Sequence, residues 1–265
     1  MRSKLKTTLL ILLSLLVLCA FSSDALAAKK KKKKVGGTRR SKAVAYMRAM
    51  ATIEWTPSSE ISYWQPNGVH NFKVGNTYHG LPYTQYGRET TLQDFKGFLK
   101  KNDQKKSVYN GPTGRYQYRG SDCSSSVSMA WKQVDPEFPI CSTGAMFPER
   151  NQRIVKAGDY DVTSGNDTKK IVADNGKDRM FAAYGKMRPG DAVLMRRGSG
   201  HVRLVVKVLP KKQEVVTIEQ CGKGPNSEGK FTTWRVDKHY SYEELFNTGY
   251  IPISLKAFHA PKKKK

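Results

Sequence analysis

The sequence predicts an α+β protein in which helices come first and a run of strands follows. Apolar residues recur at helical spacing in three segments of the first half, 43–55, 90–99 and 124–134. In the last third of the chain the pattern changes to short runs rich in Val and Ile, separated by turn residues. This order is typical of N-terminal helices packed on an antiparallel β-sheet or a small barrel.

Start and stop signals bound the predicted helices. Pro57 ends the first helix, and Pro136 stops the third, which begins at Ser124. A further helix is predicted at 166–173. Loops with short extended pieces are expected in segment 56–90, which is rich in Gly, Asn, Pro and Tyr. The polar segment 101–119 is expected to be a loop, and segment 141–180 to be irregular.

Five strands are predicted after the last of these loops. They cover 192–195, 202–209, 215–218, 231–236 and 250–255. The turn at 210–212 makes the second and third strands an antiparallel hairpin. Residues 242–246 are predicted to form a short helix or a turn.

The first 27 residues have the pattern of an export signal. Three cations among the first six residues precede an apolar run at 9–18, and small residues at 25–27 follow it. The apolar run is shorter than the roughly 20 residues that a bilayer span needs, although a permanent anchor is the alternative interpretation. We therefore expect a signal peptide at 1–27 and a secreted or cell-wall-associated protein.

The formal net charge of +25 is concentrated in part at the two chain ends, in lysine runs at 29–34 and 262–265. Like charges repel and bury nothing, so we expect a disordered basic linker at 28–42, a single domain at 43–261 and a basic tail. Anionic wall polymers are the expected partners of these arms. Nucleic acid is another candidate, and solvated arms without a partner are a third. We expect a monomer.

Three cysteines follow the export signal: Cys123, Cys141 and Cys221. Because the number is odd, at least one thiol stays outside any disulfide within the chain. One arrangement joins Cys141 to Cys221 and leaves Cys123 as a thiol. The sequence has no His-Glu-x-x-His, paired Cys-x-x-Cys, phosphate-loop or dinucleotide pattern, so neither a metal nor a cofactor is expected.

Cys123 stands where the third predicted helix begins, directly after Asp122, a residue type suited to the N-cap. The N–H groups and positive end of a helix favour a thiolate over a thiol. A thiolate is the form in which cysteine acts as a nucleophile. The backbone N–H of Cys123 is also well placed to help bind an oxyanion.

A histidine and a pair of polar residues follow on the predicted strands. His201 opens a strand after a glycine-rich hairpin, and Gly200 is expected to leave room beside its imidazole. A histidine near a cysteine can take the thiol proton and later give it to the leaving amine. Glu219 or Gln220, at the end of the next strand, could hold the imidazole in one orientation. Neighbouring strand residues point to opposite faces, so only one of the two can do this.

These motifs occur in the order found in the NlpC family of cell-wall cysteine peptidases, within the papain-like group, which the sequence resembles over about residues 80–222. The matching segments are Asp122-Cys123-Ser124, Pro189-Gly190-Asp191, His201-Val202 and Gly80-Leu81-Pro82-Tyr83. The ending Glu219-Gln220 is similar to that of the related CHAP amidases. The resemblance implies a papain-like fold with the catalytic cysteine at a helix N-terminus and hydrolysis of peptide or amide bonds in peptidoglycan stem peptides.

The resemblance also implies roles for individual residues. Cys123 would be the nucleophile, His201 the base and Glu219 the orienting residue, with Gln220 in reserve. Residues expected beside the substrate are Tyr83, Asp122, Ser124 and Gln220. The chain departs from the family at Ser125, where glycine is usual, in the long spacing from Tyr83 to Cys123, and at Glu219, where histidine is usual.

A second class of function is a non-catalytic polycationic protein that binds the wall or nucleic acid on the same scaffold. The complete set of cysteine, histidine and glutamate favours the enzyme, because a pure binding protein needs none of the three.

Overall fold

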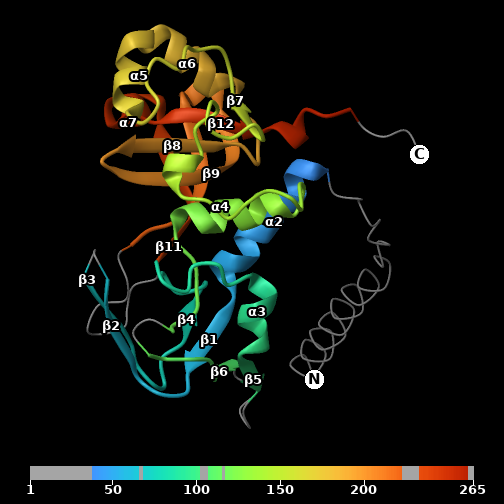
Figure 1. Cartoon of the computed structure of the whole chain (residues 1–265), viewed down its shortest axis with the longest axis vertical. Coiled ribbons are helices and arrows are strands. Elements are labelled where there is room, and N and C mark those ends of the chain that lie inside the picture. Colours follow the sequence, from blue (N-terminus) through green and yellow to red (C-terminus); the bar gives the residue numbers. More distant parts are fainter. Residues whose placement is uncertain (1–37, 66–67, 102–106, 115–116, 223–232, 262–265) are drawn as a thin grey trace, which may run out of the picture. The chain divides into compact units, whose positions relative to one another are not determined.

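The computed structural model describes residues 38–65, 68–101, 107–114, 117–222 and 233–261 (Figure 1). The expected signal peptide, the lysine run at 29–34 and the basic tail at 262–265 lie outside these residues. The described part is mixed α/β, with six α-helices and several sheets whose strand pairs are mostly antiparallel. No described helix has both the length and the apolar character that crossing a bilayer requires.

A six-stranded antiparallel sheet forms the larger layer, with strand order β11-β10-β9-β8-β12-β7. The strands are β7 (Ile154–Lys156), β8 (Ala192–Arg197), β9 (Ser199–Leu209), β10 (Glu214–Gln220), β11 (Trp234–Ser241) and β12 (Ile251–Leu255). The five strands predicted in the last third of the chain are all present. β11 begins and ends later than expected, and β7 was not predicted.

Tight turns fix the register of the central hairpins. The turn between β8 and β9 contains Gly198 at φ 73°, a left-handed conformation that suits glycine, and it places Met195 opposite His201. The turn between β9 and β10 is a 3₁₀ helix at Pro210–Lys212, followed by Gln213 in the left-handed region. The predicted hairpin at 210–212 is therefore confirmed.

Two groups of helices cover this sheet. α2 (Arg39–Thr52) and α4 (Cys123–Lys132) pack against β9 and β10. α5 (Thr168–Asn175) and α6 (Lys177–Lys186) pack against β8 and β12, and α7 (Tyr242–Thr248) packs on both of these helices. Figure 1 shows α5, α6 and α7 on the other side of the sheet from α2 and α4.

Two boundaries differ from the sequence-based expectation. α2 begins at Arg39 with Thr38 as its N-cap, so a basic linker reaching residue 42 is wrong at its C-terminal end. α6 was not predicted, because Gly176, at φ 75°, separates it from α5 and the segment as a whole is polar.

A smaller layer is built mostly from segments that the sequence predicted as loops, together with the predicted helix at 90–99. β1 (Glu54–Pro57), β4 (Tyr78–His79), β5 (Leu99–Lys101) and β6 (Ser107–Tyr109) form a four-stranded sheet in which β1 and β6 run parallel. β2 (Ile61–Gln65) and β3 (Gly68–Phe72) form a separate hairpin, and α3 (Leu92–Gly97) lies beside the sheet. These strands have two to five residues each, too short for an alternating pattern to identify them.

The core of the smaller layer is aromatic. The Trp55 ring lies 5.2 Å from that of Phe72, 5.7 Å from Phe95 and 5.5 Å from Tyr109. All four side chains are buried. Rings at these separations add to the hydrophobic stabilisation of their burial, so this cluster holds the short strands together.

Candidate active site

The first turn of α4 carries Cys123 and is closed by a reciprocal pair of hydrogen bonds. Asp122 is the N-cap, and its Oδ1 accepts from the Ser125 backbone N–H at 2.7 Å. The Ser125 hydroxyl in turn accepts from the Asp122 backbone N–H at 2.8 Å. A cap of this kind stabilises a helix by about 1 kcal/mol. Ser125 therefore has a structural role, because its hydroxyl closes the first turn of α4.

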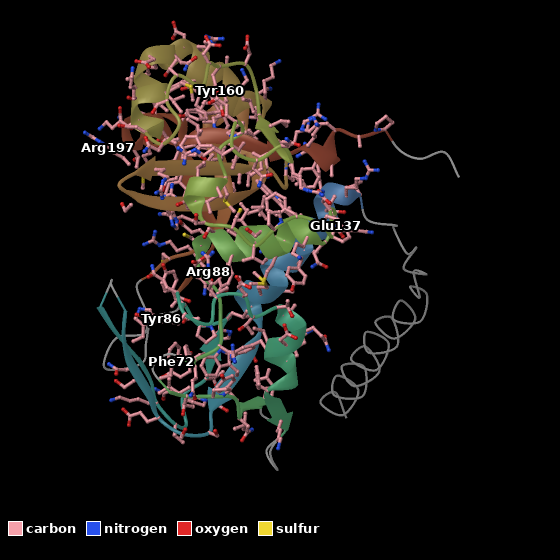
Figure 2. The ribbon with its side chains drawn as sticks, in the orientation of Figure 1. Phe72, Tyr86, Arg88, Glu137, Tyr160 and Arg197 are labelled. Carbon is pink, nitrogen blue, oxygen red and sulfur yellow. The ribbon has the colours of Figure 1, made fainter. Side chains whose placement is uncertain are left out.

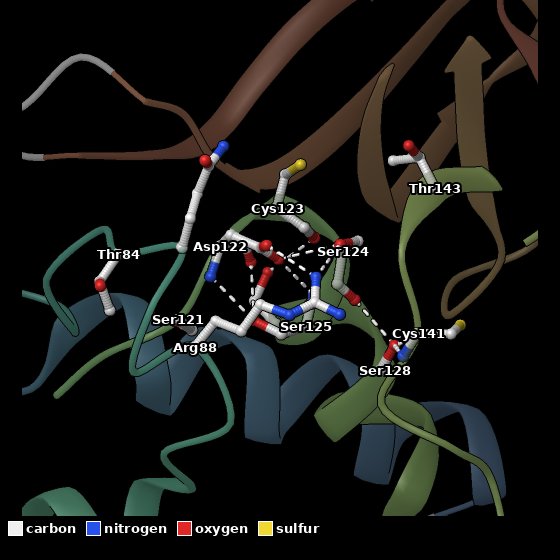
Figure 3. A network of polar contacts seen from close by, with 12 residues as sticks. Thr84, Arg88, Ser121, Asp122, Cys123, Ser124, Ser125, Ser128, Cys141 and Thr143 are labelled. Carbon is white, nitrogen blue, oxygen red and sulfur yellow. Dashed lines mark hydrogen bonds and ion pairs between the residues drawn. The ribbon is translucent and has the colours of Figure 1, made fainter. Parts of the chain in front are cut away.

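Arg88 adds a charge to this turn that the sequence analysis missed. Its Nη1 lies 2.9 Å from Asp122 Oδ2 and donates to the Ser124 hydroxyl at 3.3 Å. Figure 3 shows the Arg88 guanidinium against Asp122 and Ser124, with the Cys123 side chain pointing away from it. Arg88 follows Tyr83 along the chain, far from Asp122 in sequence. Its contact with Asp122 in the folded protein is what identifies it as part of the site.

The Cys123 sulfur is protonated in this environment. The side chain is 8% exposed, and burial, together with the neighbouring Asp122 carboxylate, raises its pKa to about 12. Backbone N–H groups of Val202, Ser124 and Cys123 act in the opposite direction but do not offset the rise. The helix N–H groups do favour the thiolate, as expected, but burial and Asp122 outweigh them.

His201 is held by a buried carboxylate on the neighbouring strand. Its Nε2 lies 2.5 Å from Glu219 Oε2, and the Glu219 side chain is fully buried. Glu219 is ionised and can only accept, so Nε2 is the nitrogen that carries hydrogen in the neutral ring. The second ring nitrogen, Nδ1, is left as the acceptor.

The charge of Glu219 is compensated from several sides. Burial would raise its pKa, but the hydrogen bond from His201 and the charge of Arg203 more than offset this and hold the pKa at about 2. Arg203 Nε donates to Glu219 Oε2 at 2.9 Å, and the Tyr240 hydroxyl donates to Oε1. The Arg203 guanidinium also lies over the rings of Tyr240 and Tyr250, at 3.7 and 4.3 Å from their centroids.

Gln220 points to the opposite face of β10 from Glu219. Its Oε1 accepts from the Ser121 hydroxyl at 2.6 Å, and its Nε2 donates to the Leu81 carbonyl at 2.8 Å. It is fully buried, so the expectation that Gln220 contacts substrate is wrong. The alternation of side chains along β10 decides between the two residues and selects Glu219.

The Tyr83 segment reaches Cys123 through the backbone despite its distance in sequence. Tyr83 forms a parallel bridge with Ser121, and Gly87 forms one with Arg119. Glycine is required at this approach, because a Cβ on Gly120 would lie 2.1 Å from the Pro82 carbonyl oxygen. The long spacing between these segments contains α3 and two strands of the smaller sheet, β5 and β6.

A cavity of about 680 Å³, which we call the Cys123 cavity, collects most of the predicted residues. It is lined by five of them: Tyr83, Asp122, Cys123, Ser124 and His201. Glu219 lies behind His201. The wall also includes Arg88 and Arg196, which the sequence analysis did not identify. Figure 2 shows Arg88 beside the start of α4 and Arg197, the neighbour of Arg196, on the β8–β9 hairpin.

Gly200 makes room for a different side chain than expected. A Cβ at this position would lie 2.1 Å from Thr143 Oγ1, so the missing side chain accommodates Thr143. Thr143 lines the Cys123 cavity and accepts a hydrogen bond from Arg196 Nη1 at 3.2 Å. The glycine therefore shapes the cavity wall opposite α4.

No disulfide forms among the described cysteines. The Cys141 sulfur lies 3.7 Å from the Ser128 hydroxyl on α4, and the Cys221 sulfur lies 3.3 Å from the Thr233 carbonyl oxygen. The arrangement that joins Cys141 to Cys221 is therefore not formed, because the Cys141 sulfur contacts Ser128 and the Cys221 sulfur contacts Thr233. Within the described ranges, no group of three or more His, Cys, Asp or Glu side chains could hold a metal ion.

No family model matches the chain, and the searches of curated proteins and of solved structures also gave no match.

Proposed function

We propose that this protein is a cysteine hydrolase that cleaves peptide or amide bonds, with Cys123 as nucleophile, His201 as base and Glu219 as the orienting residue. The observation that supports this most strongly is that Cys123 and His201 line one cavity while His201 Nε2 lies 2.5 Å from a buried, ionised Glu219. Burying the charge of Glu219 is costly, and Arg203 is needed to compensate it. A histidine with a purely structural role would not need such a partner, so this arrangement favours a functional role for His201.

The protonated state of Cys123 determines the order of the proposed steps. Nδ1 of His201 takes the thiol proton as the sulfur attacks the carbonyl carbon, so no resting thiolate is needed. The imidazolium, stabilised by Glu219, then gives this proton to the leaving amine as the carbon–nitrogen bond breaks. Water, activated by the same imidazole, hydrolyses the thioester and returns the thiol.

The substrate class rests on the resemblance to the NlpC family and on charge. Peptidoglycan stem peptides carry free carboxylates, and Arg196 lines the Cys123 cavity, where its guanidinium donates to the neutral Thr143 hydroxyl. An arginine in a cavity is well suited to bind a carboxylate in a bidentate manner. We propose that the protein acts outside the cytosol on these peptides, following the export signal in its sequence.

Digestion of purified wall peptides, followed by mass spectrometry, tests this function. The full chain should release fragments that differ from the substrate by one hydrolysed peptide or amide bond. His201→Ala should remove the activity almost as completely as loss of the nucleophile, because the thiol then has no base. Unchanged cleavage by a folded His201→Ala variant would exclude the proposed chemistry.

A further inference from the structure

A second cavity, of about 400 Å³, lies near the other end of α4. Trp131, in the last turn of α4, donates its indole N–H to the Gly190 carbonyl at 2.9 Å, and the next residue, Asp191, lines this cavity. We call it the cation cavity, because its wall carries four cationic side chains: Arg40, Lys156, Lys186 and Arg188. Cavities of this size accommodate small charged ligand groups.

The two carboxylates of the cation cavity are already engaged. Asp191 is 2% exposed, lies 2.6 Å from Arg40 Nη1 and accepts from the Ser254 hydroxyl at 2.5 Å. Asp159 lies on the exposed rim, where its Oδ1 is 3.3 Å from Arg179 Nη2. Neither is therefore left to neutralise the remaining cations.

Three cations of the cavity have no such partner. Within the described part of the chain, no ion pair with a carboxylate is formed by Lys156, Lys186 or Arg188, and all three are exposed. The Lys156 ammonium donates instead to the Tyr160 carbonyl at 2.5 Å. Clustered cations repel one another, and a bound anion would remove that repulsion.

Both ends of the described chain lie beside this cavity. Arg39, adjacent to Arg40, donates from Nη1 to the Ala257 and Ala260 carbonyls at 3.0 and 2.7 Å. Figure 1 shows the first turn of α2 next to the C-terminal segment. The lysine runs at 29–34 and 262–265 are attached covalently within a few residues of this junction.

We propose that the cation cavity binds phosphate groups of a linear phosphodiester polymer. Arginine and lysine side chains suit phosphate oxygens, and a linear polymer can contact the cavity and the two lysine runs together. A membrane surface is less suited, because binding to it needs exposed hydrophobic side chains near the cations. Among the described residues, the large hydrophobic side chains that are exposed lie elsewhere: Val74, Tyr86 and Val236. Among the described lining residues, the one aromatic ring is the His259 imidazole, and it is already hydrogen-bonded with the Ser254 hydroxyl at 2.9 Å, so nucleobase stacking is not favoured.

The test measures binding of poly(glycerol phosphate) by calorimetry over a salt series. The probe variant is Lys186→Gln with Arg188→Gln, which leaves the buried Arg40–Asp191 pair intact. The matched control is Lys211→Gln with Lys212→Gln, two exposed lysines on the β9–β10 turn. All proteins are full chains that also carry Cys123→Ala, so the result does not depend on the proposed hydrolysis.

The probe variant should bind about tenfold more weakly at low salt, and the slope of log Kd against log salt should fall by about 1.4, since each lost phosphate contact contributes about 0.7. The control should stay within about twofold of the parent. Equal losses in both variants, or none in the probe variant, would overturn the cavity as the site. A single-stranded DNA or an anionic vesicle that binds more tightly, with the same sensitivity to Lys186 and Arg188, would replace the proposed polymer as partner.

Discussion

The two cavities at the ends of α4 differ in how their charges are compensated. Near Cys123, the cations around the reacting groups lie against buried carboxylates, Arg88 against Asp122 and Arg203 against Glu219. In the cation cavity, the carboxylates are engaged within the fold and exposed lysine and arginine side chains remain. Figure 2 labels Arg88 near one end of α4 and Glu137 beyond the other.

This difference means that paired buried charges orient the reacting groups, whereas unpaired exposed charges attract an external ligand. A buried charge with several partners holds its hydrogen-bonded neighbour in one geometry, as Glu219 holds His201, because any other arrangement would leave it uncompensated. An exposed cation without a partner is free to bind an external anion. We therefore expect substitutions of the oriented groups, Cys123, His201 and Glu219, to change turnover, and substitutions of unpaired cations to change binding of an external anion.

The largest expected effect separates the two cavities directly. Cys123→Ala should lower hydrolysis of a small soluble wall peptide by about 10⁵-fold, because the nucleophile is lost, while the melting temperature stays near that of the parent. Cys141→Ala is the matched control, a buried cysteine outside the Cys123 cavity, and should retain activity. Lys186→Gln with Arg188→Gln should leave this turnover unchanged. Near-normal turnover by the Cys123→Ala protein would remove the nucleophile assignment.

The next effect compares adjacent residues of β10. Glu219→Gln should lower kcat by about 10³-fold, because the amide cannot stabilise the imidazolium that forms during the reaction. Gln220→Ala should leave kcat within a few-fold and lower the free energy of unfolding by about 1–3 kcal/mol through lost hydrogen bonds to Ser121 and Leu81. A greater loss of activity from Gln220→Ala than from Glu219→Ala would mean that the wrong face of the strand has been chosen.

The pKa of Glu219 predicts a contribution to acid stability. The folded protein lowers this pKa from its ordinary value of 4.5 to about 2, so the folded state favours the ionised form. The resulting stabilisation, about 3 kcal/mol, is present above about pH 4.5 and is lost as the pH falls toward about 2. Urea unfolding at a series of acidic pH values should show a shallower fall for Glu219→Gln. Identical slopes in the two proteins would contradict the assigned pKa.

A smaller effect concerns substrate recognition in the Cys123 cavity. Arg196→Gln should raise KM by about tenfold for a peptide whose carboxylate is free and leave KM unchanged for its amide, because the guanidinium binds charge. Arg197→Gln is the matched control. Equal changes for the free acid and the amide would show that Arg196 shapes the cavity wall without contacting the carboxylate.

The smallest expected effect concerns the C-terminal lysine run. Replacing the four lysines at 262–265 by Gln should leave turnover of a small peptide within about twofold, while binding to an anionic wall polymer weakens and becomes less dependent on salt. Steady-state kinetics and sedimentation with intact walls would measure the two quantities. If the small peptide slows as much as the walls, the run belongs to the catalytic site.

The sequence by itself determined the parts of this protein that depend on neighbouring residues. Asp122 before Cys123 specifies a capped helix start, and short runs rich in β-branched residues specify β9 and β10, because capping and strand preference act within a few residues. Tertiary structure decided the rest. The short strands around Trp55 form because distant aromatic rings bury one another, and the backbone bridge between Tyr83 and Ser121 brings Tyr83 to the start of α4.

Tertiary structure also decided the electrostatics of both cavities. The helix end at Cys123 predicted a thiolate, but burial and Asp122 raise the thiol pKa, an effect that depends on atoms the local sequence does not place. The cation cavity joins Arg40 to Lys186 and Arg188, residues that are far apart along the chain. Local patterns fix which elements form, whereas desolvation and long-range charge depend on how those elements pack.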